Sequence, residues 1–155
     1  RFEMRWAGDV GDVDIAERIE DQKLEGCVTW IGEQEDMAPL FDWADILLMP
    51  SREDPFPLVV LEAGQRSVPT ICFDQRAGGI HAVVEQGAGI VVPYLDVQEM
   101  AKQIIALIGN PARLKSLGQT AREIIVRDFN MEVVTRDIAV VIDGARSKLA
   151  KNPLE

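Results

Sequence analysis

The sequence predicts an α/β fold with three layers, α/β/α, in which a mostly parallel sheet is followed by C-terminal helices. Up to Val92, short runs rich in β-branched and aromatic residues alternate with longer amphipathic runs. Beyond Val92 the apolar residues recur only at the spacing of a helix. A regular succession of strand, crossover and strand is typical of parallel sheets that are covered on both faces.

The predicted strands and the crossover segments between them alternate along the chain. The strands are bounded by Gly, Pro or Asp and comprise Phe2–Ala7, Cys27–Ile31, Asp45–Met49, Thr70–Phe73 and Ile90–Val92. The amphipathic crossover segments are Val13–Lys23, Glu35–Trp43, Pro57–Arg66 and Ile80–Glu85. This order is Rossmann-like, and in such open sheets a ligand binds beyond the carboxyl ends of the strands.

The last part of the chain is predicted to be helical. Asp96 and Glu99 form a capping-box-like pair that begins one helix, and Gly109-Asn110 ends it. Pro111 begins the next helix, and a third starts near Asn130. The apolar stripes on the three helices comprise Ala101, Ile104, Leu107 and Ile108, then Leu114, Leu117, Ala121 and Ile124, and finally Val134, Ile138, Val141 and Ile142.

Length and composition indicate one soluble domain. The 155 residues suffice to bury a core, and we expect residues 1–150 to form a single domain, with 151–155 as a vector-derived tail. A net charge of −10 opposes binding to nucleic acid or anionic lipid, which favour clusters of Lys and Arg. Apolar runs such as Ile46–Met49 and Leu58–Leu61 are far shorter than a membrane-spanning helix requires.

The cysteines and tryptophans are expected to be structural. Cys27 and Cys72 each lie in a strand-like run, which predicts buried free thiols and a reducing cytoplasm. No Cys-x-x-Cys motif or Cys/His cluster occurs, so the sequence predicts no metal site. Trp6, Trp30 and Trp43 lie in or beside predicted core elements, and we expect them to pack in the core.

The segment from Pro50 to Gly64 carries the strongest functional signal. Its prolines, Pro55 and Pro57, favour an abrupt helix start, whose free N–H groups and positive dipole end suit a phosphate. Asp54 stands just before this helix. Glu62 is predicted to lie on or beside the inward face, where a mostly buried carboxylate needs hydrogen-bond donors such as ribose hydroxyls.

The spacing of the two acids also fits a purely structural interpretation. Asp54 is then only the N-cap of a helix, and Glu62 is only an acid on the helix surface. Because an Asp-x7-Glu pair is common, the spacing alone does not decide between the two interpretations.

The complete segment resembles the donor-site motif of the group 1 (family 4) retaining glycosyltransferases of GT-B fold. That motif is a Glu-x7-Glu pair in a frame of Pro-Ser, acid, Phe, Leu-Val and Leu-Glu-Ala. The matching residues here are Pro50-Ser51, Asp54, Phe56, Leu58-Val59 and Leu61-Glu62-Ala63. The resemblance covers residues 28 to 109 through Gly32, Ala44-Asp45, Pro69–Phe73, Gly78-Gly79, Gly87-Ala88-Gly89 and Val92-Pro93.

The resemblance implies that the chain binds a nucleotide-diphosphate sugar. Glu62 would hold the donor ribose, and Asp54 would contact hydroxyls of the donor sugar. The diphosphate would be held by backbone amides in the segment formed by Phe56, Pro57, Leu58 and Val59.

Further loops are assigned to the donor by the same resemblance. The loop of Gly32, Glu33 and Gln34 would lie against the nucleobase. Gly78 and Gly79 would let the backbone approach the sugar or phosphate closely, which a side chain would block. The remaining candidates for contact with the donor are Arg52, Glu53, Pro55 and His81.

The sequence departs from the family pattern at three points. The leading acid is Asp54 rather than Glu, so Glu53 is a candidate to share its role. His81-Ala82 stands where the family often has Pro-Glu. The strand and helix that carry Arg and Lys for the diphosphate are not in this sequence, which leaves Arg52 and Arg76 as possible phosphate ligands. In a sheet of order 3-2-1-4-5-6 that missing strand is central, so the first strands must pair differently or leave a gap.

We therefore interpret the chain as the C-terminal, donor-binding domain of a two-domain GT-B enzyme of hexosyltransferase type. Such an enzyme transfers a sugar to a hydroxyl acceptor with retention, without a metal or another cofactor. Its partner would be the acceptor-binding N-terminal domain of the same polypeptide, and the isolated fragment would be inactive. The alternatives are a non-catalytic binding or assembly module of the same fold and a sugar-nucleotide epimerase. A phosphoacceptor receiver domain is set aside, because Met49-Pro50 and Pro93-Tyr94 replace its required Asp and Lys.

Overall fold

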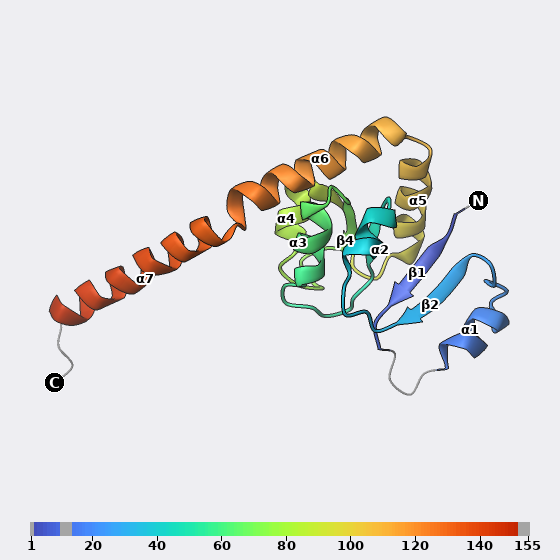
Figure 1. The fold of residues 1–155 in the computed structure, drawn as a ribbon, viewed down its shortest axis with the longest axis horizontal. Coiled ribbons are helices and arrows are strands. Elements are labelled where there is room, and N and C mark those ends of the chain that lie inside the picture. Colours follow the sequence, from blue (N-terminus) through green and yellow to red (C-terminus); the bar gives the residue numbers. More distant parts are fainter. Residues whose placement is uncertain (1, 10–13, 152–155) are drawn as a thin grey trace. The chain divides into compact units, whose positions relative to one another are not determined.

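The computed structural model of the chain describes residues 2–9 and 14–151, so residues 152–155 of the predicted tail lie outside the described residues. Every predicted strand and helix is present, with ends within a few residues of the expected positions (Figure 1). The strands are β1 (Met4–Ala7), β2 (Val28–Gly32), β3 (Leu47–Met49), β4 (Thr70–Phe73) and β5 (Gly89–Val92). The helices are α1 (Ile15–Asp21), α2 (Ala38–Trp43), α3 (Leu58–Gln65), α4 (His81–Val83), the π-helical turn η1 (Val84–Ala88), α5 (Val97–Ile108), α6 (Pro111–Asp128) and α7 (Met131–Lys151).

The chain forms two compact units, residues 1–40 and residues 41–155. In the first, β1 and β2 pair in parallel, with Trp6 opposite Trp30. α1 connects these strands and buries only Ile15. The prediction that the tryptophans pack in the core is wrong, since Trp6 and Trp30 of this unit are 43% and 44% exposed and Trp43 of the second unit is 39% exposed. One short helix over a two-stranded sheet leaves most of the strand side chains uncovered.

The second unit is built on the parallel sheet β3–β4–β5. All four residues of the central strand, β4, are buried. Their side chains alternate between two cores, because successive residues of a strand point to opposite faces. Cys72 packs in one cluster, whereas Ile71 and Phe73 pack in the other.

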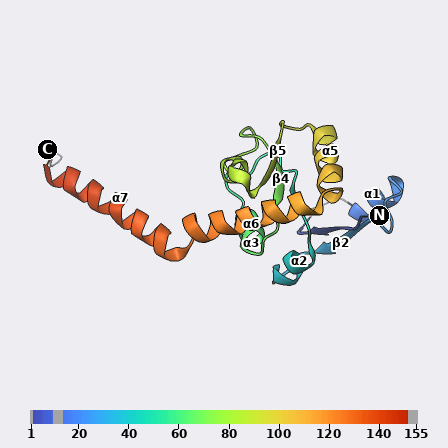
Figure 2. The ribbon, with the colours of Figure 1, turned by 90° about the horizontal axis from the view of Figure 1, so that it is seen from above.

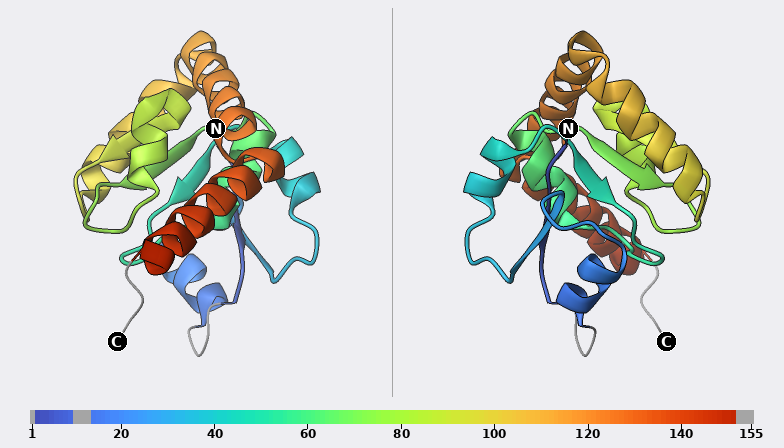
Figure 3. Two further views of the ribbon diagram at one scale, coloured as in Figure 1. Left: turned by 90° about the vertical axis from the view of Figure 1, so that its left-hand side faces the viewer. Right: turned by 90° about the vertical axis from the view of Figure 1, so that its right-hand side faces the viewer.

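Helices cover both faces of this sheet, which confirms the predicted three layers (Figure 3). The first cluster joins β4 to α3, α4, η1 and α6, and the second joins it to α5. Glycines let α6 approach α3 and the turn that follows it: a Cβ at Gly64 of α3 would lie 3.0 Å from a side-chain carbon of Ile125, and one at Gly118 of α6 would overlap the carbonyl oxygen of Ser67. On α5 the buried residues are Met100 and Leu107, while Ile108 of the predicted stripe is 51% exposed.

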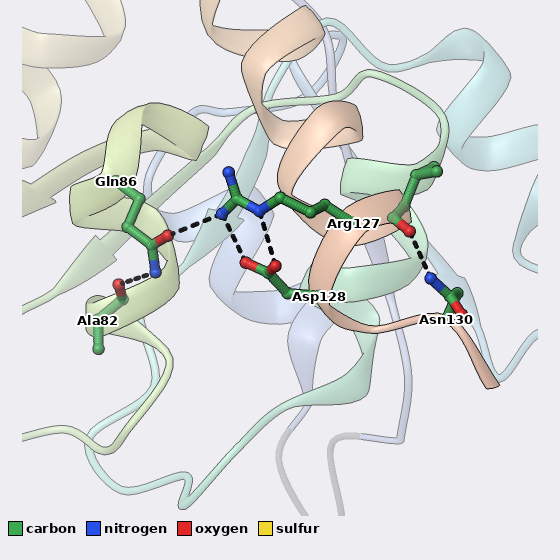
Figure 4. Close-up of polar contacts among 6 residues, drawn as sticks. Ala82, Gln86, Arg127, Asp128 and Asn130 are labelled. Atoms are coloured by element: carbon green, nitrogen blue, oxygen red, sulfur yellow. Dashed lines mark hydrogen bonds and ion pairs between the residues drawn. The ribbon is translucent and has the colours of Figure 1, made fainter. Parts of the chain in front are cut away.

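A polar junction joins α6 to α7. The side chain of Asn130 donates to the carbonyl of Val126 at 2.7 Å and accepts from the amide of Val133 at 3.0 Å, so it caps both helices. Figure 4 shows the neighbouring ion pair of Arg127 with Asp128, and the hydrogen bond from Arg127 to Gln86 of η1. Beyond this junction α7 extends away from the sheet of its unit (Figures 1 and 2).

Most of the predicted apolar stripe of α7 faces solvent, while Val134 near the start of the helix is half-buried. Ile138, Val141 and Ile142 are all exposed, as are Met131 and Val140. In the part of the chain that the structure describes, no helix combines the length and the apolar character needed to cross a membrane.

The strands form two separate sheets rather than one. β1 pairs with β2, and β4 pairs with β3 and β5, while no strand pairing joins the two sheets among the described residues. The separation of the strands into two sheets corresponds to the gap, which was one of the two expected outcomes.

Candidate functional site

The carboxyl ends of β3, β4 and β5 place three loops at one edge of the sheet. These are the β3–α3 loop (residues 50–57), the β4–α4 loop (residues 74–80) and the β5–α5 loop (residues 93–96). A hollow at this edge is lined by Met49, Ser51, Asp54, Pro57, Cys72, Phe73, Ala77, Gly78 and Ile80. Three of the predicted donor residues, Asp54, Pro57 and Gly78, therefore meet at this strand-end hollow, where ligands bind in open α/β sheets.

The β3–α3 and β4–α4 loops are joined backbone to backbone. The amide of Asp54 donates to the carbonyl of Ala77 at 2.8 Å, and the amide of Gly79 donates to the carbonyl of Pro55 at 2.9 Å. A Cβ at Gly78 would overlap the carbonyl oxygen of Asp54, and one at Gly79 would lie 3.0 Å from that of Pro55. The glycine pair thus lets the two loops touch, and its close approach to a sugar or phosphate stays a prediction.

The N-terminus of α3 opens beside the hollow. Its N-cap residue is Pro57, which makes no side-chain cap hydrogen bond. Since the first turn of a helix has amides without intrahelical partners and a positive dipole end, this geometry suits an anion. Phe56 and Leu58 are exposed, Val59 is half-buried, and Pro55 is exposed at the loop surface. The ring of Phe56 lies 6.0 Å from that of Phe129 at the end of α6.

Asp54 and Glu62 differ in their surroundings. Asp54 is half-buried in the wall of the hollow. Glu62 is exposed, so the expectation of a mostly buried carboxylate is wrong. The buried residues of α3 are Val60, Ala63 and Gly64, which define an inward face that turns Glu62 towards solvent. Glu62 is accordingly free of the desolvation cost that was expected to require a partner.

Arg76 is held by a neighbouring carboxylate. Its Nε and Nη2 donate to the two carboxylate oxygens of Asp74 at 3.0 Å and 2.7 Å. The guanidinium hydrogen bonds hold the pKa of the Asp74 carboxyl well below its usual range. This pairing makes Arg76 a poor candidate for a phosphate ligand. Arg52 and Glu53 are exposed in the β3–α3 loop, where Arg52 remains a candidate.

His81 begins α4 and is half-buried. Its Nδ1 lies 2.7 Å from the carbonyl oxygen of Gly78. Because a carbonyl oxygen only accepts, Nδ1 is the donor of this hydrogen bond. His81 therefore supports the glycine turn, and its contact with a donor sugar stays a prediction.

The residues assigned to the nucleobase belong to the first unit. Gly32 ends β2 with φ +68°, a left-handed conformation that favours glycine. Glu33 and Gln34 are exposed, and the side chain of Gln34 donates to the carbonyl of Ile31 at 2.6 Å. Their participation in one site with the second unit stays a prediction.

The buried thiol of Cys72, in the wall of the hollow, makes the stability of the core depend on pH. Burial and the charge of Glu85 raise the pKa of its thiol to about 12, whereas the ordinary value is 9.0. The unfolded chain therefore loses this proton first as pH rises, and the contribution of Cys72 to stability declines from pH 9.0 upwards. We expect the difference in free energy of unfolding between the wild type and Cys72→Ala to narrow between pH 8 and pH 10. Denaturant titrations at each pH measure this difference in free energy of unfolding, and Cys27→Ala is the control. A difference that stays constant from pH 8 to pH 10 contradicts the expectation.

From the sequence, Tyr94 in the β5–α5 loop was a candidate for the rim of the site and was given no further role. Its hydroxyl donates to the carbonyl of Arg52 at 3.1 Å, across a separation of 42 residues. Its position at the end of a predicted strand was the only signal in the sequence. Nothing in the sequence pattern shows which loop its hydroxyl reaches.

Comparison with known proteins agrees with this geometry. The sequence model of a family described as glycosyl transferases group 1 matches residues 1–110. Over 121 residues the chain is 31% identical to N-acetyl-alpha-D-glucosaminyl L-malate synthase of Bacillus anthracis, covering 77% of this chain and 31% of that protein. The chain thus spans about a third of the length of that relative.

Solved structures share the fold. Sucrose-phosphate synthase of Thermosynechococcus elongatus superimposes with a TM-score of 0.77 at 26% identity, covering 94% of this chain and 38% of that one. HepE of Anabaena, solved in complex with UDP, gives a TM-score of 0.82 at 24% identity, covering 92% of this chain and 41% of that one. These similarities confirm the predicted Rossmann-like α/β fold.

Proposed function

Because the chain belongs to the glycosyl transferase group 1 family, we propose that it is the donor-binding part of a glycosyltransferase. The donor is a nucleotide-diphosphate sugar, and the sugar passes to a hydroxyl acceptor with retention at the anomeric carbon. The observation that carries this proposal is the N-terminus of α3, which opens beside a hollow containing the half-buried carboxylate of Asp54.

The diphosphate binds at the first turn of α3. The amides near Phe56, Leu58 and Val59 donate to its oxygens, and the helix dipole favours its negative charge. This interaction strengthens as the leaving diphosphate gains charge in the transition state, so it assists the reaction as well as binding. Donor binding therefore needs no metal ion or further cofactor.

Two carboxylates orient the rest of the donor. Asp54, in the wall of the hollow, accepts hydrogen bonds from hydroxyls of the sugar, with Glu53 beside it in the loop. Glu62 is exposed on α3, where both of its oxygens are accessible to the ribose hydroxyls. Gly32, Glu33 and Gln34 contact the nucleobase. Catalysis by such a site consists mainly of positioning the anomeric carbon and stabilising the leaving group.

The acceptor site belongs to another part of the polypeptide. The relative from Bacillus anthracis is about three times as long as the region that this chain matches. The exposed apolar residues of α7, among them Ile138, Val141 and Ile142, offer a surface for that part. This chain alone binds the donor weakly and transfers nothing. Its free cysteines, Cys27 and Cys72, suit the reducing cytoplasm, where we place the reaction.

Calorimetric titration with UDP, GDP and ADP tests the proposal. We expect one nucleoside diphosphate to bind, its monophosphate to bind at least tenfold more weakly, and EDTA to leave both affinities unchanged. The monophosphate is the matched control, because it keeps the base and ribose but lacks the second phosphate. Absence of binding at millimolar ligand to this chain and to the whole polypeptide would sink the proposal and favour a non-catalytic module of the same fold.

A further inference from the structure

Tyr94 links the β5–α5 loop to the β3–α3 loop. Its hydroxyl donates to the carbonyl oxygen of Arg52 at 3.1 Å. In the described part of the chain, this is the one hydrogen bond to the backbone of residues 51–53. The next backbone contact of the loop is made by Asp54, whose amide donates to Ala77. Tyr94 thus holds the part of the loop that leads directly into Asp54.

The ring of Tyr94 is itself fixed from several sides. Its edge-to-face contact with Phe73 joins ring centroids 6.0 Å apart at an interplanar angle of 73°. On the ring face, the guanidinium carbon of Arg76 lies 5.3 Å from the centroid. The Tyr94 amide donates to a carboxylate oxygen of Asp74 at 3.2 Å. Since Asp74 also holds Arg76, these residues form one connected cluster.

This cluster is suited to orientation rather than to binding. The carboxylate of Asp74 accepts from the amide and the guanidinium of Arg76 and from the amide of Tyr94. Its acceptor sites are therefore used within the protein, and the guanidinium of Arg76 is paired. Among the described residues, the Tyr94 hydroxyl makes the one hydrogen bond between this cluster and residues 51–53 of the β3–α3 loop.

We propose that Tyr94 is a positioning residue, which acts through the Arg52 carbonyl to fix residues 51–53 and thereby the carboxylate of Asp54. Tyr94 touches no donor atom in this role. The effect on donor affinity rests on the proposed function, whereas the effect on the loop does not. An ordered loop binds better than a mobile one, because less conformational entropy is lost when the donor binds.

The test uses Tyr94→Phe, which removes the hydroxyl but keeps the ring that contacts Phe73 and Arg76. We expect exchange of the Asp54 amide, which donates to Ala77 and is followed in a peptide covering residues 50–57, to rise about twofold to tenfold, the range for one lost hydrogen bond. Affinity for the nucleoside diphosphate falls by a similar factor, while the thermal unfolding midpoint stays close to that of the wild type. The control is Val97→Ala, whose side chain is 61% exposed three residues along the chain.

The outcomes separate this inference from the proposed function. Unchanged exchange in residues 50–57 of Tyr94→Phe overturns the positioning role, whatever the nucleotide does. A general rise in exchange across the strands of the sheet also overturns the positioning role, because the hydroxyl would then stabilise the whole unit rather than the loop. Faster exchange confined to the loop supports the role even where the wild type binds no nucleotide, and in that case only the proposed function fails.

Discussion

Replacing Gly78 with alanine is expected to lower the free energy of unfolding by about 2 to 5 kcal/mol and to weaken nucleotide binding. Gly78 has φ +149°, and a Cβ there would overlap the carbonyl oxygen of Asp54. The oxygen belongs to the backbone and the position of a Cβ is fixed by the backbone, so no side-chain rotation relieves the overlap. The loops must separate, which breaks the hydrogen bonds from Asp54 to Ala77 and from Gly79 to Pro55. Denaturant unfolding measures the loss.

Gly87→Ala is the matched control for the backbone conformation. Gly87 lies in the same unit with φ +102°, but its added Cβ would meet only a methyl carbon of Thr120 at 3.2 Å. We expect a smaller loss of about 1 to 2 kcal/mol, because only the strained φ remains. Equal losses at the two positions would show that the contact between the loops contributes nothing, which contradicts the explanation given for Gly78.

Replacing Glu62 with alanine is expected to weaken binding of the nucleoside diphosphate by about tenfold to a hundredfold, with little effect on stability. The proposed function gives this carboxylate two ribose hydroxyls, and hydrogen bonds to a charged group are the strong ones. Stability is unaffected because Glu62 is exposed and faces away from the buried side of α3. Calorimetry measures the affinity, and thermal unfolding checks the fold.

Two further variants sharpen this prediction. Glu62→Gln keeps one acceptor oxygen and should retain part of the affinity. Gln65→Ala alters an exposed side chain three residues further along the same helix and should bind like the wild type. Wild-type affinity in Glu62→Ala would remove Glu62 from the site and leave it as a surface acid, the structural interpretation that its spacing also allowed.

The element order was predictable because it rests on local signals. Pro111 and Asn110 mark the start of α6, where the Asn110 side chain accepts from the amide of Arg113 at 3.0 Å. Asp96 does the same for the amide of Glu99 at the start of α5. Such caps depend only on residues that are close in sequence, so a single sequence predicts them without knowledge of the tertiary contacts.

The orientation of α3 was not predictable in the same way. Leu58, Val59, Val60 and Leu61 are all apolar, so no helical period distinguishes one face from another. The inward face is set by α6, where Ile125 lies against Gly64. Because that contact joins residues far apart in the sequence, the exposure of Glu62 emerged only from the fold.

The candidate site likewise contains features that the sequence predicts and features that only tertiary contacts determine. The meeting of Asp54 with Gly78 follows from the rule that ligand loops gather at the carboxyl ends of parallel strands, and the motif resemblance pointed to both. The hydrogen bond from Tyr94 to Arg52 depends on the exact reach of one side chain between loops. Trp6 and Trp30 show the opposite error: their place in predicted strands suggests a core, but a two-stranded sheet has too few neighbours to provide one.

The division of the strands into two sheets has a consequence for cooperativity. A two-stranded sheet with one short helix is marginal in stability, and a segment of the size of residues 1–40 rarely folds by itself. Residues 41–155 contain a three-stranded sheet with a core on each face. Heating this chain should therefore produce a broad early change in the first unit and a sharp later transition in the second. A two-state fit to the whole curve would mix the two, so unfolding energies of core variants belong to the later transition alone.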